Sequence, residues 1–482
     1  MPPKHGLVSA LATATAAACL GVALEATATA APRDPRPGAP GVGDPLFPTL
    51  GNGGYDVQNY DLAFDFTPGT YAFTGTVKIK ATATHDLSSF NLDTDGHTIE
   101  SVTVDGDAAE WALSAGQSGQ ELTVTPDEAL RRHRSFTVTV AYRGNGKDPR
   151  SGLSGWRYIS DGGFVSAVQA SRADTFAPVN DHPSDKATWS FHLTAPEGWT
   201  AGANGDLTGT RPAGEGKTTW DFRLKSPMAP ELMGISVAKQ TYLRSKGPNG
   251  VRLRHLVPSD QVEKYRPITE ETGPQMVWLE RKLGARFPFS TYGVQIVRDG
   301  YGDALENQTL SLFGPNWFTR PTYSITMVHE LAHQYFGDSV TPKNWQQAWL
   351  NEGPATYFGV LWGDEHGLAD LDAKMKAAYT KLETVRKTDG PPGKPKGLGG
   401  FNIYDGGALV LYALRAQVGD ADFDAILKAW VHRFRDGNAD SEDFIDNAVR
   451  TTGDASLRPF LEGWLYGLEN PPMPGRPDWK QA

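Results

Sequence analysis

The residues best suited to chemistry are two histidines and a glutamate in the second half of the chain. His329 and His333 lie four residues apart in the segment HELAH, and side chains at this spacing share one face of a helix. Glu352, in the segment WLNEG, follows after eighteen intervening residues, enough for a loop and a second helix to bring its carboxylate back. Two imidazoles and one carboxylate suit zinc and leave one position open, as in catalytic rather than structural sites.

Glu330 follows the first histidine and is rotated about 100° around the helix, so that it flanks the open position. A carboxylate there can accept a proton from an attacking water. The alternative is that Glu330 is a helix-surface carboxylate without a role. The three candidate ligands around it argue against this alternative. The sequence therefore predicts one zinc ion held by His329, His333 and Glu352, with Glu330 as the general base.

Composition excludes several other classes of site. Cys19 is the only cysteine of the 482 residues, so a disulfide within the chain and a thiolate zinc cluster are both impossible. A formal net charge of -10 argues against a nucleic-acid partner. The apolar fraction of 39% supports sizeable cores, and the length suits two or three domains.

The elements that must position the site change in character along the chain. In residues 55–243, apolar residues alternate with polar ones, as in the segments VKIKA (77–81) and FTVTV (136–140). This period of two, interrupted by turn signals, predicts short strands in an antiparallel sheet or sandwich. In residues 244–482 the period shifts toward 3.6, which predicts a mainly helical α+β region. The sequence shows no internal repeat.

The N-terminus has the features of a secretory signal peptide over residues 1–30. Lys4 precedes an Ala-rich apolar run, and Ala28-Thr29-Ala30 offers a cleavage site after Ala30. A lipoprotein acylated at Cys19 is the less favoured alternative. Residues 31–54 are rich in Pro, Gly and Ala and predict a flexible leader. No later segment has about 18 unbroken apolar residues, so no membrane span is expected.

The zinc motif and its surroundings resemble the M1 family of gluzincin aminopeptidases. The flanking segments FGD (336–338) and WLNEG (349–353) match that family, as do YDV (55–57), NDHP (180–183) and KAT (186–188). The resemblance extends from about Tyr55 to Gly467. It implies an all-β N-terminal saddle or sandwich domain over residues 55–243 and a thermolysin-like zinc catalytic domain over residues 244–482. The implied substrates are peptides with a free N-terminus, handled by a secreted monomer.

The resemblance also implies a substrate-binding segment. Residues 303–307, DALEN, are similar to the family's G-x-M-E-N motif, in which the glutamate binds the substrate's α-ammonium. Glu306 is therefore the expected amine anchor, with Ala304 and Asn307 beside the substrate. A fixed carboxylate rewards a cationic N-terminus. Asp303 for Gly and Leu305 for Met depart from the pattern; the Leu conserves volume, whereas the Asp adds a charge.

Two further roles follow from the resemblance. Tyr404, in IYDGGAL (403–409), matches the family's catalytic tyrosine, whose hydroxyl donates to the developing oxyanion. Gln169 lies twelve residues before Asp181, where the family has a second amine-binding Glu or a Gln. A Gln leaves the amine with one carboxylate instead of two. Pro354 stands where the family often has Phe, and proline is best tolerated in a first helical turn, so the helix of Glu352 is expected to begin near residues 351–353.

Three alternatives remain open. An M1-like epoxide hydrolase would reuse the zinc site, a non-catalytic peptide-binding homologue would reuse only the fold, and a gluzincin endopeptidase would lack the amine anchor. Other family members have a helical C-terminal domain that closes over the site. The chain ends at Ala482, from which we expect a more open cleft and longer peptide substrates.

Overall fold

The computed structural model describes residues 34–115, 120–147 and 155–479. The chain divides into two compact units, Met1–Asp34 and Pro35–Ala482, and the helices and strands of the described residues belong to the second. The predicted signal peptide, including Cys19, lies outside the described residues. Within the described ranges, no helix combines the length and the apolar character needed to cross a membrane.

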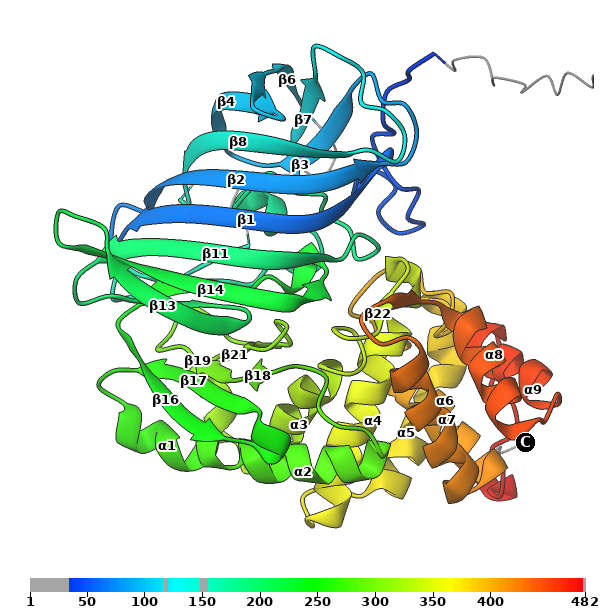
Figure 1. The fold of residues 1–482 in the computed structure, drawn as a ribbon. Helices are drawn as coiled ribbons and strands as arrows, with labels where there is room; N and C mark the ends of the chain where they lie inside the picture. The colour runs from blue at the N-terminus through cyan, green and yellow to red at the C-terminus, as the bar shows by residue number, and fades with distance from the viewer. Residues whose placement is uncertain (1–33, 116–119, 148–154, 480–482) are drawn as a thin grey trace, which may run out of the picture. The chain divides into compact units, whose positions relative to one another are not determined.

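The largest sheet has eight strands in the order β13-β14-β11-β1-β2-β8-β4-β5. Figure 1 shows the long strands of this sheet side by side. All neighbours are antiparallel except β1 and β11, which are parallel. Alternate residues of β2 are buried, as the period of two predicts. The strands are β1 (Tyr55–Thr67), β2 (Ala72–Ala83), β4 (Thr98–Val104), β5 (Asp107–Ala108), β8 (Ser135–Asn145), β11 (Ala187–Pro196), β13 (Asp206–Pro212) and β14 (Lys217–Met228).

Two smaller sheets share one hydrophobic core with the large sheet. Stacked aromatic side chains fill this core; the rings of Trp156 and Phe176 are 4.3 Å apart between centroids. One small sheet consists of β3 (Phe90–Thr94), β6 (Glu110–Ala115) and β7 (Gln120–Thr125). The other consists of β9 (Trp156–Tyr158), β10 (Phe164–Ser166), β12 (Thr200–Ala203) and β15 (Ile235–Ala238).

A mixed sheet begins the second half of the fold. Its order is β16-β17-β19-β21-β20, with β18 beside β17. β16 (Gln240–Lys246) spans the expected domain boundary at residues 243 and 244. β20 (Ala304–Leu305) is the last strand of the order, so one of its edges lacks a neighbouring strand. The remaining strands are β17 (Arg252–Pro258), β18 (Thr291–Tyr292), β19 (Val294–Ile296) and β21 (Ser311–Phe313).

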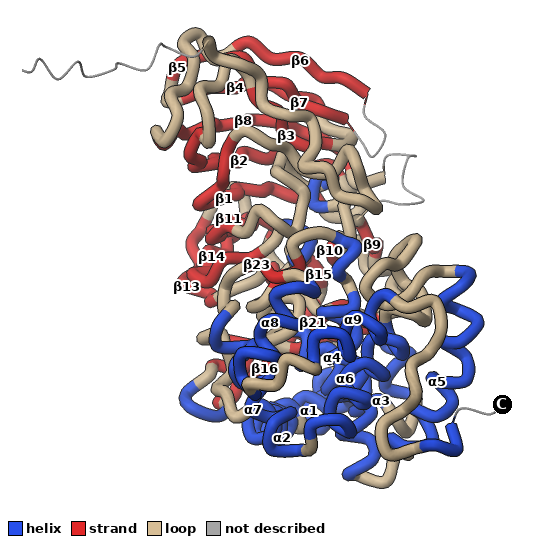
Figure 2. Tube along the Cα trace, turned by 90° about the vertical axis from the view of Figure 1, so that its right-hand side faces the viewer, coloured by secondary structure: helices blue, strands red, loops and turns tan. Residues whose placement is uncertain are grey.

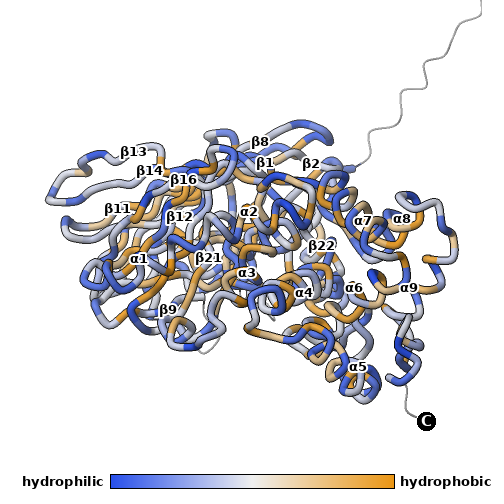
Figure 3. The backbone as a smooth tube through the Cα atoms, turned by 90° about the horizontal axis from the view of Figure 1, so that it is seen from below, coloured by the Kyte–Doolittle hydropathy of each residue, from blue (hydrophilic) through white to orange (hydrophobic). Residues whose placement is uncertain are grey.

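Helices make up most of the remaining chain, and Figure 2 separates this helical part from the strands. Hydrophobic and hydrophilic stretches alternate along α8 in Figure 3, as in a helix with one buried face. The fold class predicted from the sequence, all-β followed by mainly helical α+β, is confirmed. The helices are α1 (Val262–Glu270), α2 (Thr272–Leu283), α3 (Tyr323–His333), α4 (Trp349–Glu365), α5 (Leu371–Thr388), α6 (Tyr404–Val418), α7 (Asp420–Arg433), α8 (Ser441–Thr452) and α9 (Leu457–Tyr466).

Two glycines bring α4 and α6 into backbone contact. A Cβ atom at Gly353 would lie 2.8 Å from the Cα atom of Gly407, so a larger residue would force the helices apart. This contact lies one residue beyond Glu352 on α4 and one turn beyond Tyr404 on α6. It therefore holds the first turns of the two helices, and the two side chains, near each other.

The expected start of the Glu352 helix is wrong by two residues. α4 begins at Trp349, so Pro354 is its sixth residue and lies beyond the first turn. Proline at this place cannot bond to the carbonyl group four residues earlier. A 3-10 turn, Trp345–Gln347, runs directly into α4, and this early start explains the difference.

The expected flexible leader is also wrong for residues 35–54. Asp44 is only 2% exposed, and its carboxylate accepts hydrogen bonds from the Trp345 backbone at 2.7 Å and from the His182 ring at 3.2 Å. Leu50 and Asn52 are buried as well. The Pro/Gly-rich composition of this segment suggested mobility, but specific contacts with residues distant in sequence hold it in place.

One pH-dependent contribution to stability comes from the outer face of the large sheet. His192 on β11 bonds Asp61 at 3.1 Å and Asp221 at 2.5 Å, and these contacts, led by the Asp61 hydrogen bond, raise its pKa to about 9. Protonated His192 thus stabilises the fold. This stabilisation is fully present below the unfolded-state pKa of about 6.5 and is lost as the pH rises through the folded-state pKa of about 9.

We expect His192→Gln to lower the free energy of unfolding by about 1 kcal/mol at pH 6, because a one-third-exposed side chain is partly screened. At pH 10 the difference should vanish. Chemical denaturation at both pH values measures it, with the exposed His432→Gln as the control. An equal loss at both pH values would mean that packing, not charge, is responsible.

Candidate metal centre

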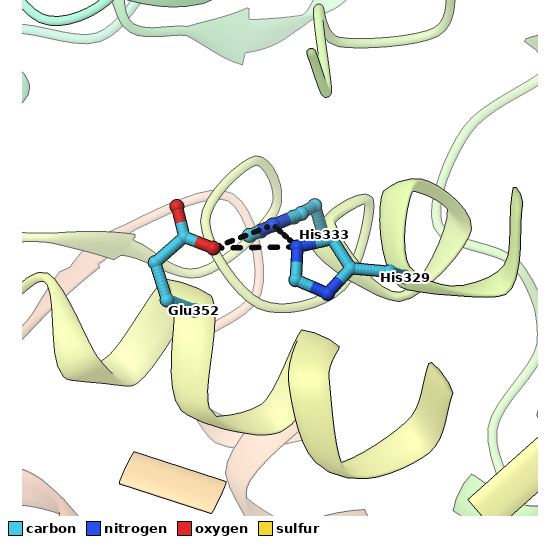
Figure 4. A group of neighbouring side chains, drawn as sticks. All are labelled: His329, His333 and Glu352. Atoms are coloured by element: carbon cyan, nitrogen blue, oxygen red, sulfur yellow. Dashed lines mark hydrogen bonds and ion pairs between the residues drawn. The ribbon is translucent and has the colours of Figure 1, made fainter. Parts of the chain in front are cut away.

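The three predicted ligands converge on one point, as Figure 4 shows. The Nε2 atoms of His329 and His333 are 3.1 Å apart. Each lies 3.3 Å from Oε2 of Glu352. α3 supplies both histidines from consecutive turns, and the first turn of α4 supplies the glutamate.

These distances fit a zinc ion. In a tetrahedral site with bonds of about 2.0–2.1 Å, two ligand atoms lie roughly 3.3 Å apart. Glu352 Oε2 is buried and makes no hydrogen bond of regular geometry, although it faces both rings. The Nδ1 atom of His333 lies 3.2 Å from the Phe336 carbonyl, which leaves Nε2 directed at the common point. A buried oxygen without a regular bond, beside two imidazole nitrogens, indicates a cation between them.

The electrostatics of the ligand set agree with this interpretation. Burial alone would raise the pKa of Glu352, but the charge of His333 and contacts from both rings lower it overall. Burial would lower the pKa of His333, and Glu306 and Glu352 outweigh it, so the pKa rises well above its usual value. The protein thus surrounds this point with negative charge that a divalent cation would offset.

Glu330 lies on α3 between the two ligands and is 4% exposed. One carboxylate oxygen each of Glu330 and Glu306 and a ring nitrogen of His333 lie within 4.8 Å of one another. Burial raises the pKa of Glu330; His333 opposes this, while Glu306 and Glu352 raise it further. A carboxylate that binds a proton more readily than usual is suited to accept one during a reaction.

Tyr404 faces the same centre from the first residue of α6. Its ring is parallel to that of His329, with 6.3 Å between centroids. Burial raises the pKa of Tyr404, and the negative charges of Glu352 and Glu306 raise it further. The hydroxyl group therefore keeps its proton and can donate a hydrogen bond.

A cavity of about 770 Å³ joins these groups to the predicted amine-binding residues. Glu306 is 3% exposed, and the Gln169 amide nitrogen donates to its Oε1 at 2.6 Å across 137 residues of sequence. The cavity brings together nearly all of the residues named from the sequence: Gln169, Ala304, Glu306, His329, Glu330, His333, Glu352 and Tyr404.

The other residues of the DALEN segment are placed differently. Asp303 is exposed at the cavity and Leu305 is buried within β20. Asn307 is 2% exposed and is not among the cavity-lining residues. Its side chain packs so closely on Gly234 that a Cβ atom there would lie 2.9 Å from its Nδ2. A direct role for Asn307 in binding substrate remains a prediction.

Two buried carboxyl groups near the centre were not predicted from the sequence to belong to the site. Glu231 and Asp338 are both 0% exposed, and none of their four carboxylate oxygens has a hydrogen-bond partner among the described residues. Burial, and then the charge of Glu306, raise the pKa of each well above its usual value. Glu231 belongs to no recognisable spacing, and Asp338 was noted only as the last residue of the FGD segment, without a role, so only the fold places both near the centre.

Comparison with protein families gives two matches along the chain. The model described as the peptidase M1 N-terminal domain matches residues 57–231. The model described as the peptidase family M1 domain matches residues 269–464. The second range contains all three metal-site residues, Glu330, Glu306 and Tyr404.

Solved structures and a curated protein give a consistent result. An M1 zinc metallopeptidase mutant from Deinococcus radiodurans bound to Tyr-Ser-Ala is 29% identical, with a TM-score of 0.78, covering 91% of this chain and 100% of that chain. The same organism's M1 zinc metallopeptidase without the mutation is 28% identical, with a TM-score of 0.77, covering 90% and 99%. Leucine aminopeptidase 2 of Aspergillus fumigatus is 23% identical over 87% of this chain and 71% of its own length.

Proposed function

This chain belongs to the M1 family of zinc metallopeptidases, and we propose that it removes single residues from peptides with a free N-terminus, with Glu330 as general base. The observation that carries this proposal is the placement of a buried carboxylate pair, Glu306 and Glu330, in one cavity with the three zinc ligands. One carboxylate can bind an ammonium group while the other transfers protons.

Each residue contributes a distinct step to the proposed reaction. One zinc ion held by His329, His333 and Glu352 supplies, when bound, a Lewis acid that acidifies water and polarises a carbonyl group. Glu330 accepts a proton from the attacking water and delivers it to the nitrogen of the leaving peptide. Tyr404 donates a hydrogen bond to the carbonyl oxygen as negative charge develops there.

The position of cleavage is set by the residues at the amine end. Glu306 pairs with the α-ammonium group, and Gln169, already bonded to Glu306, completes that end of the cavity. β20, as an edge strand, offers the Ala304 backbone to an extended peptide. Because Glu306 cannot pair with a mid-chain peptide nitrogen, only the first bond of the chain reaches Glu330 in the correct geometry.

Acetylation of the substrate N-terminus tests this proposal. Zinc-loaded protein should release the first residue of a tripeptide but leave the N-acetylated tripeptide intact, because acetylation removes the positive charge. Mass spectrometry of the products detects both outcomes. Equal cleavage of the two peptides would indicate an endopeptidase; turnover of epoxides alone would indicate an epoxide hydrolase, and no turnover a binding protein.

We also propose that the protein is exported after cleavage behind Ala30 and acts as a monomer with one zinc ion. The support for export is the charged, apolar and small-residue order of the first thirty residues. Intact-mass measurement of protein from the culture medium tests the cleavage site, and light scattering tests the monomer. An acylated Cys19 at the new N-terminus would contradict the proposed processing.

A further inference from the structure

Glu231 is buried behind the amine end of the cavity without a partner. It lies in a 3-10 turn, Pro230–Leu232, is 0% exposed, and neither carboxylate oxygen makes a regular hydrogen bond among the described side chains. A buried carboxylate without a partner is costly. Its position beside the residues that bind the substrate's amine in the proposed function points to a role in that end of the site.

The fold clamps Glu231 between the segments that carry Gln169 and Glu306. Ser166, three residues before Gln169, bonds the Met233 carbonyl at 3.0 Å and the Ile235 amide at 2.8 Å. On the other side, the Asn204 side chain donates to the carbonyls of Leu232 and Gln308 at 3.0 and 2.6 Å. These bonds fix the backbone that follows Glu231 against the segments of both residues.

Gln169 lies between Glu231 and the cavity. Glu231 is not a lining residue, whereas Gln169 is. The Gln169 amide is close enough to lower the pKa of Glu231, against the larger effects of burial and of the charges of Glu306 and Asp181. A carboxamide has two N–H donors and one carbonyl acceptor. One donor is committed to Glu306, which leaves the other available to the neighbouring Glu231 carboxyl group.

We propose that Glu231 is a positioning residue for N-terminus recognition: it holds the Gln169 amide group toward the two carboxylates, so that the Gln169 carbonyl oxygen accepts from the substrate's α-ammonium. This inference rests on the proposed function.

Asp338 offers a matched control. It too is fully buried, and neither carboxylate oxygen has a hydrogen-bond partner among the described residues. The charges of Glu306 and His333 shift its pKa. Its backbone carbonyl accepts from Lys186 at 2.8 Å, and Gln169 is not among the groups that shift its pKa. Asp338→Asn therefore removes a similar buried carboxyl group without changing the neighbours of the Gln169 amide.

The experiment compares steady-state kinetics of zinc-loaded variants on an aminoacyl anilide. We expect Glu231→Gln to raise KM about 10-fold with kcat changed less than about 3-fold. The double variant with Glu231→Gln and Gln169→Ala should have a KM no higher than that of Gln169→Ala alone, because Glu231 acts through Gln169. The exchange variant, Gln169→Glu with Glu231→Gln, should return KM to within about 3-fold of wild type. Asp338→Asn should leave KM within the same range.

Calorimetry supplies a readout other than turnover. Titration of the wild type and of Glu231→Gln with Tyr-Ser-Ala and with its N-acetyl derivative should show weaker binding in the variant for the free peptide only. Equal KM in wild type and Glu231→Gln, additive losses in the double variant, or the same KM increase in Asp338→Asn would each overturn the inference. Failure of the wild type to turn over any aminoacyl anilide would instead overturn the proposed function.

Discussion

Replacement of Glu330 by glutamine is expected to lower kcat/KM by roughly 10³-fold while zinc remains bound. Glutamine preserves the shape of the side chain but cannot accept a proton from water. The three proposed zinc ligands should stay in place, because Glu330 is not one of them. Kinetics on an aminoacyl anilide and elemental analysis of the same sample measure both parts of the prediction.

Measurements of substrate binding distinguish the loss of the general base from a disruption of the whole substrate-binding site. Calorimetry should show that Glu330→Gln still binds a tripeptide with wild-type affinity within about 3-fold, since Glu306 and Gln169 are untouched. Glu330→Asp, which keeps the charge but withdraws it by one methylene, should recover part of the activity. Full activity in Glu330→Gln would assign the proton transfer to another group.

The convergence of His329, His333 and Glu352 could be predicted from the sequence because two of the three lie one helical turn apart. The spacing of His329 and His333 specifies one helix face, and only the return of Glu352 depends on tertiary structure. The alternation of apolar residues likewise predicted the sheets, since each strand must bury one face. Local periodicity thus accounts for the fold class and for the metal centre.

The amine end of the cavity could not be derived in the same way. Gln169 and Glu306 are separated by 137 residues and meet only because β10 and β20 belong to sheets that the fold brings together. Resemblance to a family supplied both residues. Glu231 has neither a motif nor a periodic position, so its relation to Gln169 depends entirely on packing.

Composition gave two wrong expectations, both where local preferences of the residues compete with other contacts. The Pro/Gly-rich segment before Tyr55 suggested a flexible chain, but Asp44 bonds the backbone of Trp345, 301 residues away. Pro354 suggested a later helix start, yet α4 begins two residues before the expected range, where the preceding 3-10 turn already has helical geometry. In both cases a tertiary contact or a neighbouring turn outweighs the propensity of the residue.

Removal of the distant ligand should have the largest effect of all. We expect Glu352→Ala to bind zinc more than about 100-fold more weakly, since even changes behind a ligand cost 10–100-fold. Activity should fall by at least about 10³-fold, because the loss of zinc would also remove the Lewis acid that acidifies the water and polarises the carbonyl group on which Glu330 and Tyr404 act. Zinc content per chain, measured after dialysis against a defined free-zinc concentration, checks the first effect directly.

Glu365→Ala, at the other end of α4, is the matched control. Glu365 pairs with Trp278 and Lys282 near the surface and does not line the cavity, so this variant should keep its zinc and its activity within about 3-fold. If both variants lost zinc equally, the cause would be a weakened helix. If Glu352→Ala alone loses it, and added zinc at high concentration restores part of the activity, the carboxylate acts as a ligand. That pattern is expected because the two imidazoles on α3 can hold a zinc ion weakly without the third ligand.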